Sequence, residues 1–179
     1  MSRNTRQRIL DGALELLRAE GGGTITLDAA ARQVGLTKPG LMYHFPTKEA
    51  LMLAVVDHVA DRWERILLDR VGLPLREASP HQRIRAYVEM AVTGDLDRAD
   101  FAIVSDALYR DTLAKVWVRR FEPWVSLPDD LPARVRGRLT AARLLADGYW
   151  TAAATDVFPV PERDRAHLLA VVDELVGNP

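Results

Sequence analysis

The side chains best suited to chemistry in this chain gather in one short stretch. They are the hydroxyl, ammonium, phenol and imidazole groups of Thr37, Lys38, Tyr43, His44 and Lys48. Hydroxyl and ammonium groups suit phosphate oxygens, while a phenol or an imidazole can also reach the nucleic-acid backbone or a thymine methyl group. The pattern therefore favours recognition of nucleic acid by hydrogen bonds and charge.

Catalytic chemistry has weaker candidates. The absence of cysteine excludes disulfides, thiolate catalysis and cysteine-based zinc sites. No serine stands in a nucleophile elbow, and Gly21 to Gly23 follow a helical pattern where a phosphate-cradling loop would follow a strand. His58 and Asp61 lie one helical turn apart and could share a metal, but such a histidine is more often packed. We predict no enzyme, no cofactor and no metal site.

Two short predicted helices position the recognition groups. Thr26 is a good cap for a helix that runs to about Val34, and Gly35 supplies the turn. Thr37 caps the next helix, and Pro39 in its first turn costs no hydrogen bond. The residues available for a buried seam are Ala30, Ala31, Leu36 and Leu41, with Phe45 and the apolar side of the first helix beneath it. This is the arrangement of a helix-turn-helix, whose second helix enters a DNA major groove.

Helical periodicity accounts for the rest of the chain. The first predicted helix starts near Asn4 or Thr5 and ends at Gly21 to Gly23. The others run from Lys48 to Asp69 or Arg70, from His81 to Val92, from Arg98 to about Phe121 with a break near Arg110 or Asp111, from Leu131 to about Ala154, and from Arg163 to Val176. The predicted connectors are residues 71–80 and 123–132. No stretch alternates with period two, so we predict an all-α fold of about nine helices.

The composition and net charge of the chain fit several classes of protein. The formal net charge is −1, from 24 basic and 25 acidic residues, while residues 1–50 hold seven basic and five acidic ones. That small excess, with Arg3, Arg6 and Arg8 at the N-terminus, also fits a solvated surface. The chain has no apolar run of about 18 residues and no visible secretory signal. We therefore expect a soluble, cytoplasmic protein.

The segment from Thr24 to Leu51 resembles the TetR family of transcriptional regulators. The matching positions are Thr26, Ala31, Gly35, Leu36, Thr37, Leu41, Tyr43, His44, Phe45, Lys48 and Leu51, with unbroken spacing. The match covers roughly the first third of the chain. The family usually has an aromatic residue where this chain has Met42, which can pack there but cannot donate to a phosphate. The resemblance implies that Pro39 and Gly40 face the bases.

Eight residues are accordingly predicted to contact DNA. They are Thr26, Thr37, Lys38, Pro39, Gly40, Tyr43, His44 and Lys48. The expected partner is double-stranded DNA that carries a palindromic operator. The resemblance implies a homodimeric regulator, most often a repressor, that a small-molecule ligand releases from DNA. Residues 1–47 would form the DNA-binding domain, and residues 48–179 would bind the ligand and dimerise.

The resemblance places two further sites in the C-terminal domain. The predicted ligand-binding residues are Tyr87, Phe101, Tyr109, Trp117, Phe121 and Tyr149, although aromatic residues at helical spacing are usually core. Small or apolar residues on the last two helices would allow two copies to pack closely. The predicted dimer-interface residues are Leu139, Ala142, Ala146, Leu169, Val172 and Val176.

Two other classes of function stay open on the sequence. An all-α protein–protein interaction module would form a folded dimer but enrich no duplex from a random pool. A helical small-molecule-binding protein without DNA function would bind its ligand tightly with no effect on any duplex.

Overall fold

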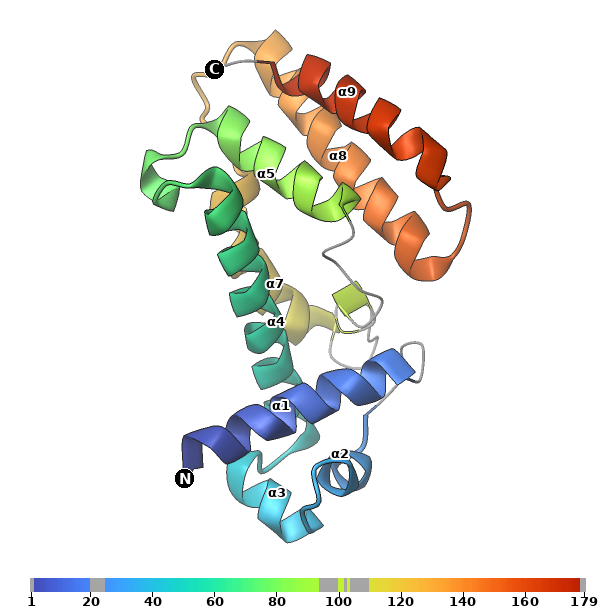
Figure 1. The fold of residues 1–179 in the computed structure, drawn as a ribbon. Coiled ribbons are helices and arrows are strands. Elements are labelled where there is room, and N and C mark those ends of the chain that lie inside the picture. The colour runs from blue at the N-terminus through green and yellow to red at the C-terminus, as the bar shows by residue number, and fades with distance from the viewer. Residues whose placement is uncertain (1, 20–24, 94–99, 102, 104–109, 178–179) are drawn as a thin grey trace. The chain divides into compact units, whose positions relative to one another are not determined.

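A computed structural model of the chain describes residues 2–19, 25–93, 100–101, 103 and 110–177 (Figure 1). Within them the structure is helical, and no strand is present. The helices are α1 (Ser2–Ala19), α2 (Leu27–Gln33), α3 (Lys38–His44), α4 (Lys48–Val71), α5 (Pro80–Val92), α7 (Arg110–Val125), α8 (Ala133–Thr155) and α9 (Arg165–Val176). The all-α prediction is confirmed, and the eight helices of the described part are close to the predicted nine. None of them has both the length and the apolar character to cross a bilayer.

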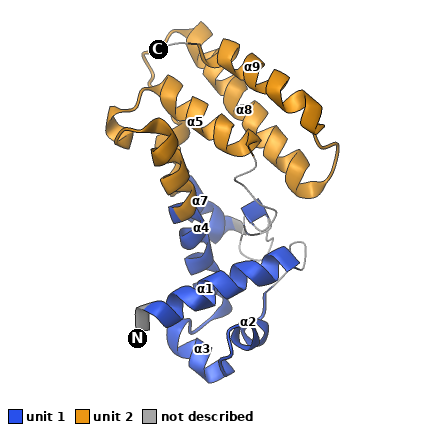
Figure 2. Ribbon diagram, in the orientation of Figure 1, with its two compact units in different colours: residues 1–61, 97–118 blue, residues 62–96, 119–179 orange. Residues whose placement is uncertain are grey.

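The chain divides into two compact units, which Figure 2 distinguishes by colour. Unit 1 comprises residues 1–61 and 97–118, and unit 2 comprises residues 62–96 and 119–179. Because α4 and α7 each cross from one range to the other, both helices contribute residues to both units. The domain boundary between residues 47 and 48 stays a prediction. Gly21–Gly23 and most of the predicted helix before Arg110 lie outside the described residues.

The helix-turn-helix of unit 1 rests on the apolar side of α1. α1 packs against α2, and α2 packs against α3 (Figure 1). The buried residues of α1 are Ile9, Leu10, Ala13, Leu14 and Leu17. Their spacing marks one face of a helix, and burying a Leu or Ile side chain contributes about 1.5–3 kcal/mol. The periodicity of α1 therefore builds the platform that holds the two shorter helices.

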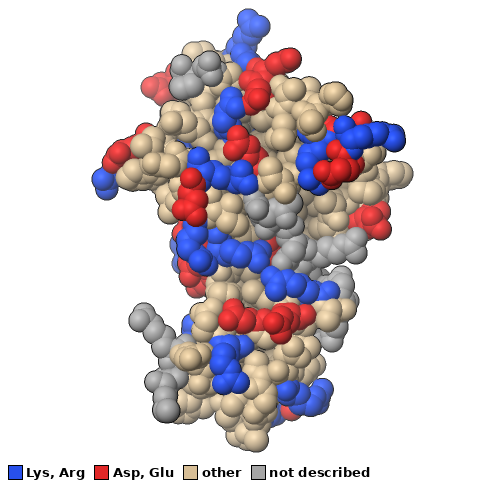
Figure 3. All heavy atoms as spheres, viewed as in Figure 1, with Lys and Arg blue, Asp and Glu red and all other residues tan. Residues whose placement is uncertain are grey.

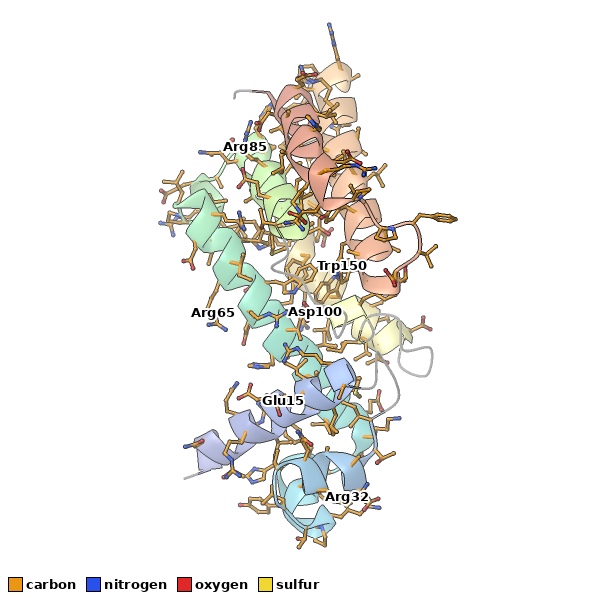
Figure 4. The ribbon with its side chains drawn as sticks, turned by 45° about the vertical axis from the view of Figure 1, so that its right-hand side comes forward. Glu15, Arg32, Arg65, Arg85, Asp100 and Trp150 are labelled. Carbon is orange, nitrogen blue, oxygen red and sulfur yellow. The ribbon has the colours of Figure 1, made fainter. Side chains whose placement is uncertain are left out.

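Gly12 lets α1 approach α2 more closely than any other residue type would. A Cβ atom at Gly12 would lie 2.5 Å from Val34 Cγ1 and 3.2 Å from Gln33 Cγ. Beside this contact Gln33 Nε2 donates to Glu15 Oε2 at 3.1 Å, and Figure 4 labels Glu15 on α1. Sequence reasoning missed this role, because the partners of Gly12 lie more than 20 positions away along the chain.

Unit 2 has its own core, built where α5 and α9 pack against α8 (Figure 1). The buried residues of this core are Ile84, Val88, Ala91 and Val92 of α5, Leu139, Ala142 and Ala146 of α8, and Val172 and Val176 of α9. α5 begins with a capping box, in which Gln82 N donates to Ser79 Oγ at 3.2 Å and Ser79 N donates to Gln82 Oε1 at 2.9 Å. The Ser-x-x-Gln spacing of a capping box is a local signal for the start of a helix.

The predicted connector of residues 123–132 is wrong at its start. α7 continues through Pro123 to Val125. Proline lacks the N–H that would bond four residues back, but in a last turn this removes only one hydrogen bond. Trp124 is buried, and Arg83 Nη1 donates to the carbonyl of Pro123. Packing of Trp124 and this side-chain bond therefore hold the last turn that the proline weakens.

Candidate nucleic-acid interface

Local sequence signals set the beginning of α3. Thr37 has extended backbone angles, and its Oγ1 accepts a hydrogen bond from Gly40 N at 3.2 Å. Pro39 lies in the first turn, as predicted. A Cβ atom on Gly40 would lie only 3.2 Å from Thr37 Oγ1, so glycine suits this tight cap. Loss of such a cap typically costs about 1 kcal/mol.

The turn between α2 and α3 depends on Gly35, whose φ of +68° lies in the left-handed region that favours glycine. Leu36 N then donates to Ala31 O at 2.9 Å, which closes the end of α2. Arg8 Nη2 of α1 donates to Val34 O at 3.1 Å and satisfies a carbonyl at the same helix end. At the other end of α2, Thr26 Oγ1 accepts from Ala29 N at 3.1 Å. Both predicted caps and the predicted turn are confirmed.

A seam of buried side chains holds α2 and α3 in a fixed orientation relative to each other. Ala30, Ala31, Leu41 and Phe45 are buried, as predicted, while Leu36 is half-buried. Arg6 of α1 lies over the Phe45 ring at 4.9 Å from the ring centroid. A cation over an aromatic face contributes about 0.5–1 kcal/mol at an exposed site. The seam holds the backbone of α3 in place, so the groups on its other side are presented in a fixed geometry.

None of the eight residues predicted to contact DNA is buried. Thr26, Thr37, Lys38, Pro39 and Tyr43 are exposed, and Gly40, His44 and Lys48 are half-buried. Tyr43 is 84% exposed, and its ring meets the His44 ring edge-on, with the ring centroids 5.2 Å apart. All eight belong to unit 1. A tyrosine side chain with this much solvent exposure is typical of a surface that binds a partner.

The charges of unit 1 do not form a purely basic surface. On the face that Figure 3 shows, Lys and Arg side chains are interspersed with Asp and Glu. The exposed Arg32 of α2, labelled in Figure 4, adds positive charge. Lys38 Nζ lies 2.9 Å from Asp28 Oδ2. An acidic residue thus stands beside one of the predicted DNA contacts, which sequence reasoning did not anticipate.

His58 is a structural histidine that ties α4 to α1. Its Nε2 lies 3.0 Å from Asp11 Oδ1, and Gln7 Nε2 lies 3.3 Å from the same ring nitrogen. Gln7 Nε2 also donates to Asp11 Oδ1 at 3.2 Å. Among the described residues, no group of three or more His, Cys, Asp or Glu side chains is placed to hold a metal ion. The geometry thus gives His58 a packing and hydrogen-bonding role.

The predicted ligand-binding residues are spread over both units. Phe101 and Trp117 belong to unit 1, and Tyr87, Phe121 and Tyr149 belong to unit 2. Tyr109 lies outside the described residues. The structure does not bring the five described residues together within one unit, so their contact with a ligand stays a prediction.

In unit 2 these aromatic groups already have partners. Tyr87 Oη donates to Asp147 Oδ1 at 2.8 Å, and Arg165 Nε donates to Tyr149 Oη at 3.2 Å. Burial, together with the Asp147 carboxylate, raises the pKa of Tyr87 above its usual range, so the phenol stays protonated and keeps donating. The Phe121 ring packs edge-on against Trp63 at 5.3 Å between centroids.

Most of the predicted dimer-interface residues are in the core of unit 2. Leu139, Ala142, Ala146, Val172 and Val176 are buried within one chain, and Leu169 is half-buried against the same core. The five buried side chains therefore have no surface to offer a second copy. A partner chain would have to contact other residues of α8 and α9.

Two family descriptions match the chain in succession. Residues 9–55 match "Bacterial regulatory proteins, tetR family". Residues 81–177 match "Tetracyclin repressor-like, C-terminal domain", which spans more than half of the 179 residues. Together with the helix-turn-helix of unit 1, these matches show that the chain belongs to the TetR family of bacterial regulatory proteins. The resemblance stated from the sequence is confirmed.

Curated relatives share mainly the N-terminal segment. The uncharacterized HTH-type transcriptional regulator TtgW of Pseudomonas putida is 42% identical over 55 residues, which cover 31% of this chain and 41% of that protein. The HTH-type transcriptional regulator SrpR, also of Pseudomonas putida, is 44% identical over 52 residues, which cover 29% of this chain and 24% of that protein. The chain thus spans less than half the length of these curated relatives.

Solved structures extend the likeness to the whole fold. A Rhodococcus sp. protein assigned to the TetR family aligns with a TM-score of 0.71 at 17% identity, over 96% of this chain and 98% of that one. The multidrug binding protein EbrR, complexed with imidazole, aligns with a TM-score of 0.65 at 22% identity, over 97% and 96% of the two chains. At such identities the likeness concerns the fold alone.

Proposed function

We propose that this chain is a homodimeric, ligand-responsive transcriptional repressor that binds a palindromic operator and leaves it when a small molecule binds. The observation that carries the proposal is the α2–α3 pair, in which a buried seam fixes α3 while Tyr43, Thr37 and Lys38 remain exposed. A helix held in this way can enter a major groove without rearrangement. The family assignment supports the same function.

Phosphate contacts would give most of the affinity. Lys48 at the start of α4 and the Tyr43 phenol supply a charged and a neutral donor from adjoining elements. Such contacts fix the register of the protein on DNA, while groups that reach base edges give specificity. Pro39 and Gly40 have no long side chain, so the α3 backbone could approach the bases closely at these two positions.

A second copy would pack on the exposed side of α8. Small or uncharged residues recur there at intervals of four and three positions, as one helix face requires. They are Gly137, Ala141, Leu144, Gly148 and Thr151, and all are exposed. A two-fold axis through this side would bring the same residues of both chains together. The dimer would then present two copies of α3 about one helical turn of DNA apart, roughly 34–36 Å.

The small-molecule ligand is proposed to act on the separation of the two α3 helices in the dimer. EbrR, which has a similar fold, is a multidrug binding protein complexed with imidazole. Binding of a small molecule by this chain would reduce DNA affinity only if the ligand favours a separation of the two α3 helices that the operator does not fit.

Alanine at Tyr43 or Lys48 is expected to weaken DNA binding by about tenfold for each variant, because a hydrogen bond to a charged group is lost. The loss should be similar for every duplex, since phosphates carry no sequence. Fluorescence anisotropy at low salt measures this loss. Titrations at several salt concentrations should also show that Lys48→Ala releases about one counterion fewer on binding than the wild type.

Lys115→Ala is the matched control, because Lys115 is an exposed lysine on α7 outside the α2–α3 pair. It removes the same charge and should change the affinity little. Unchanged affinity of Tyr43→Ala and Lys48→Ala, with both variants folded, would contradict the assignment of phosphate contacts to these residues.

A further inference from the structure

An acidic residue stands in the proposed DNA-contacting surface and faces one of its lysines. Lys38 Nζ of α3 lies 2.9 Å from Asp28 Oδ2 of α2, and the two side chains are 49% and 52% exposed. An exposed ion pair of this kind contributes little to stability. Asp28 also lies in the first turn of α2, where the helix dipole favours a carboxylate. The pair itself adds little to the fold, so its hydrogen-bonding groups are free to serve recognition.

A carboxylate at such a place opposes DNA binding unless it meets a donor. Duplex DNA carries about one negative charge for every 1.7 Å of its axis, so the phosphates repel Asp28. The ion pair as a whole carries no net charge, and Lys38 held by Asp28 therefore gives a phosphate little attraction. What the pair presents is a hydrogen-bond donor beside an acceptor.

Both partners keep capacity for further hydrogen bonds. An ammonium has three donors, and a carboxylate has about four acceptor positions. In the part of the chain that the structure describes, both side chains form only the contact between Nζ and Oδ2. Two N–H groups of Lys38 and the Oδ1 atom of Asp28 thus remain available. In the major groove, a G·C pair sets the guanine acceptors O6 and N7 beside the cytosine N4 donor.

We infer that the Asp28–Lys38 pair reads one G·C base pair in each operator half-site. Lys38 donates to guanine O6 or N7, and Asp28 accepts from the N4 amino group of cytosine. The inference rests on the proposed function, and it moves Lys38 from the phosphate contacts to the base contacts. It also makes Asp28 a specificity-determining residue, because its carboxylate is tolerated only where a base donor meets it.

The test compares the duplexes that the wild-type chain, Asp28→Asn and Lys38→Ala each enrich from a random pool. The wild-type pool should contain one G·C pair per half-site that both variants no longer require. At that position, anisotropy titrations should show the preference for G·C over the other base pairs falling by roughly tenfold. The matched control is Glu49→Gln, which removes an exposed carboxylate from the first turn of α4 and should leave the selected sequence unchanged.

Two outcomes would overturn the inference, and they differ from each other. If Asp28→Asn keeps every base preference and binds all duplexes more tightly, then Asp28 acts only through its negative charge. If the folded wild-type chain enriches no duplex, the proposed function fails together with the inference. Circular dichroism of each variant confirms that the helical fold is intact, which is expected because both side chains are on the surface.

Discussion

Leu41→Ala is expected to lower the free energy of unfolding by about 2–5 kcal/mol, the usual cost of truncating a fully buried leucine. Leu41 is the buried residue of α3, and it completes the seam with Ala30 and Ala31. The two buried residues of α2, Ala30 and Ala31, are too small to extend into the vacated space. The cavity would therefore persist, and α3 would lose the contact that fixes its orientation.

Urea unfolding followed by far-UV circular dichroism measures this loss. Met42→Ala is the matched control, because Met42 is the next residue of the same helix and is 39% exposed. It should cost less than about 1 kcal/mol. An equal loss of unfolding free energy for Leu41→Ala and Met42→Ala would show that the seam does not hold α3 against α2.

Leu144→Glu is expected to convert a dimer of this chain into monomers. Leu144 is 55% exposed on α8, and its neighbours on that side of the helix are small. In a two-fold interface the substitution would bring two glutamates together in an apolar contact, where each charge is desolvated without a partner. Operator affinity should fall with it, since one helix-turn-helix alone contacts only a half-site.

Sedimentation velocity gives the mass, which should be twice the 20.0 kDa chain mass for the wild type and equal to it for the variant. Leu68→Glu supplies the control, because Leu68 is a leucine of α4 with 39% exposure in the same unit. It should leave the dimer intact. A dimer that survives Leu144→Glu would rule out this side of α8 as the interface.

The helix-turn-helix was predictable because its signals are local. Thr26 and Thr37 cap helices, and Gly35 provides a left-handed turn, whatever the rest of the chain does. The predicted start of α3 at Lys38 therefore agrees with the structure, and the caps form the predicted hydrogen bonds. The Ser79–Gln82 capping box is an equally local signal, and its spacing alone marks the start of α5.

Features that depend on which helices meet were not predictable in this way. Periodicity identifies an apolar face of α8 but not what covers it. The sequence therefore predicts Leu139 and Ala142 at a dimer interface, whereas both are buried in the core that α8 forms with α5 and α9. The close approach at Gly12 and the ion pair between Asp28 and Lys38 both join residues of different helices. Pro123 marks a helix end in isolation, and only the packing of Trp124 explains why α7 continues.

Selection of duplexes from a random pool by the wild-type chain shows whether this chain recognises a palindromic DNA site. We expect enrichment of an inverted repeat whose half-site centres lie one helical turn apart, bound by two chains. Enrichment of no sequence by a chain shown to be a folded dimer would contradict it, and would favour a protein–protein interaction module in place of a DNA-binding repressor.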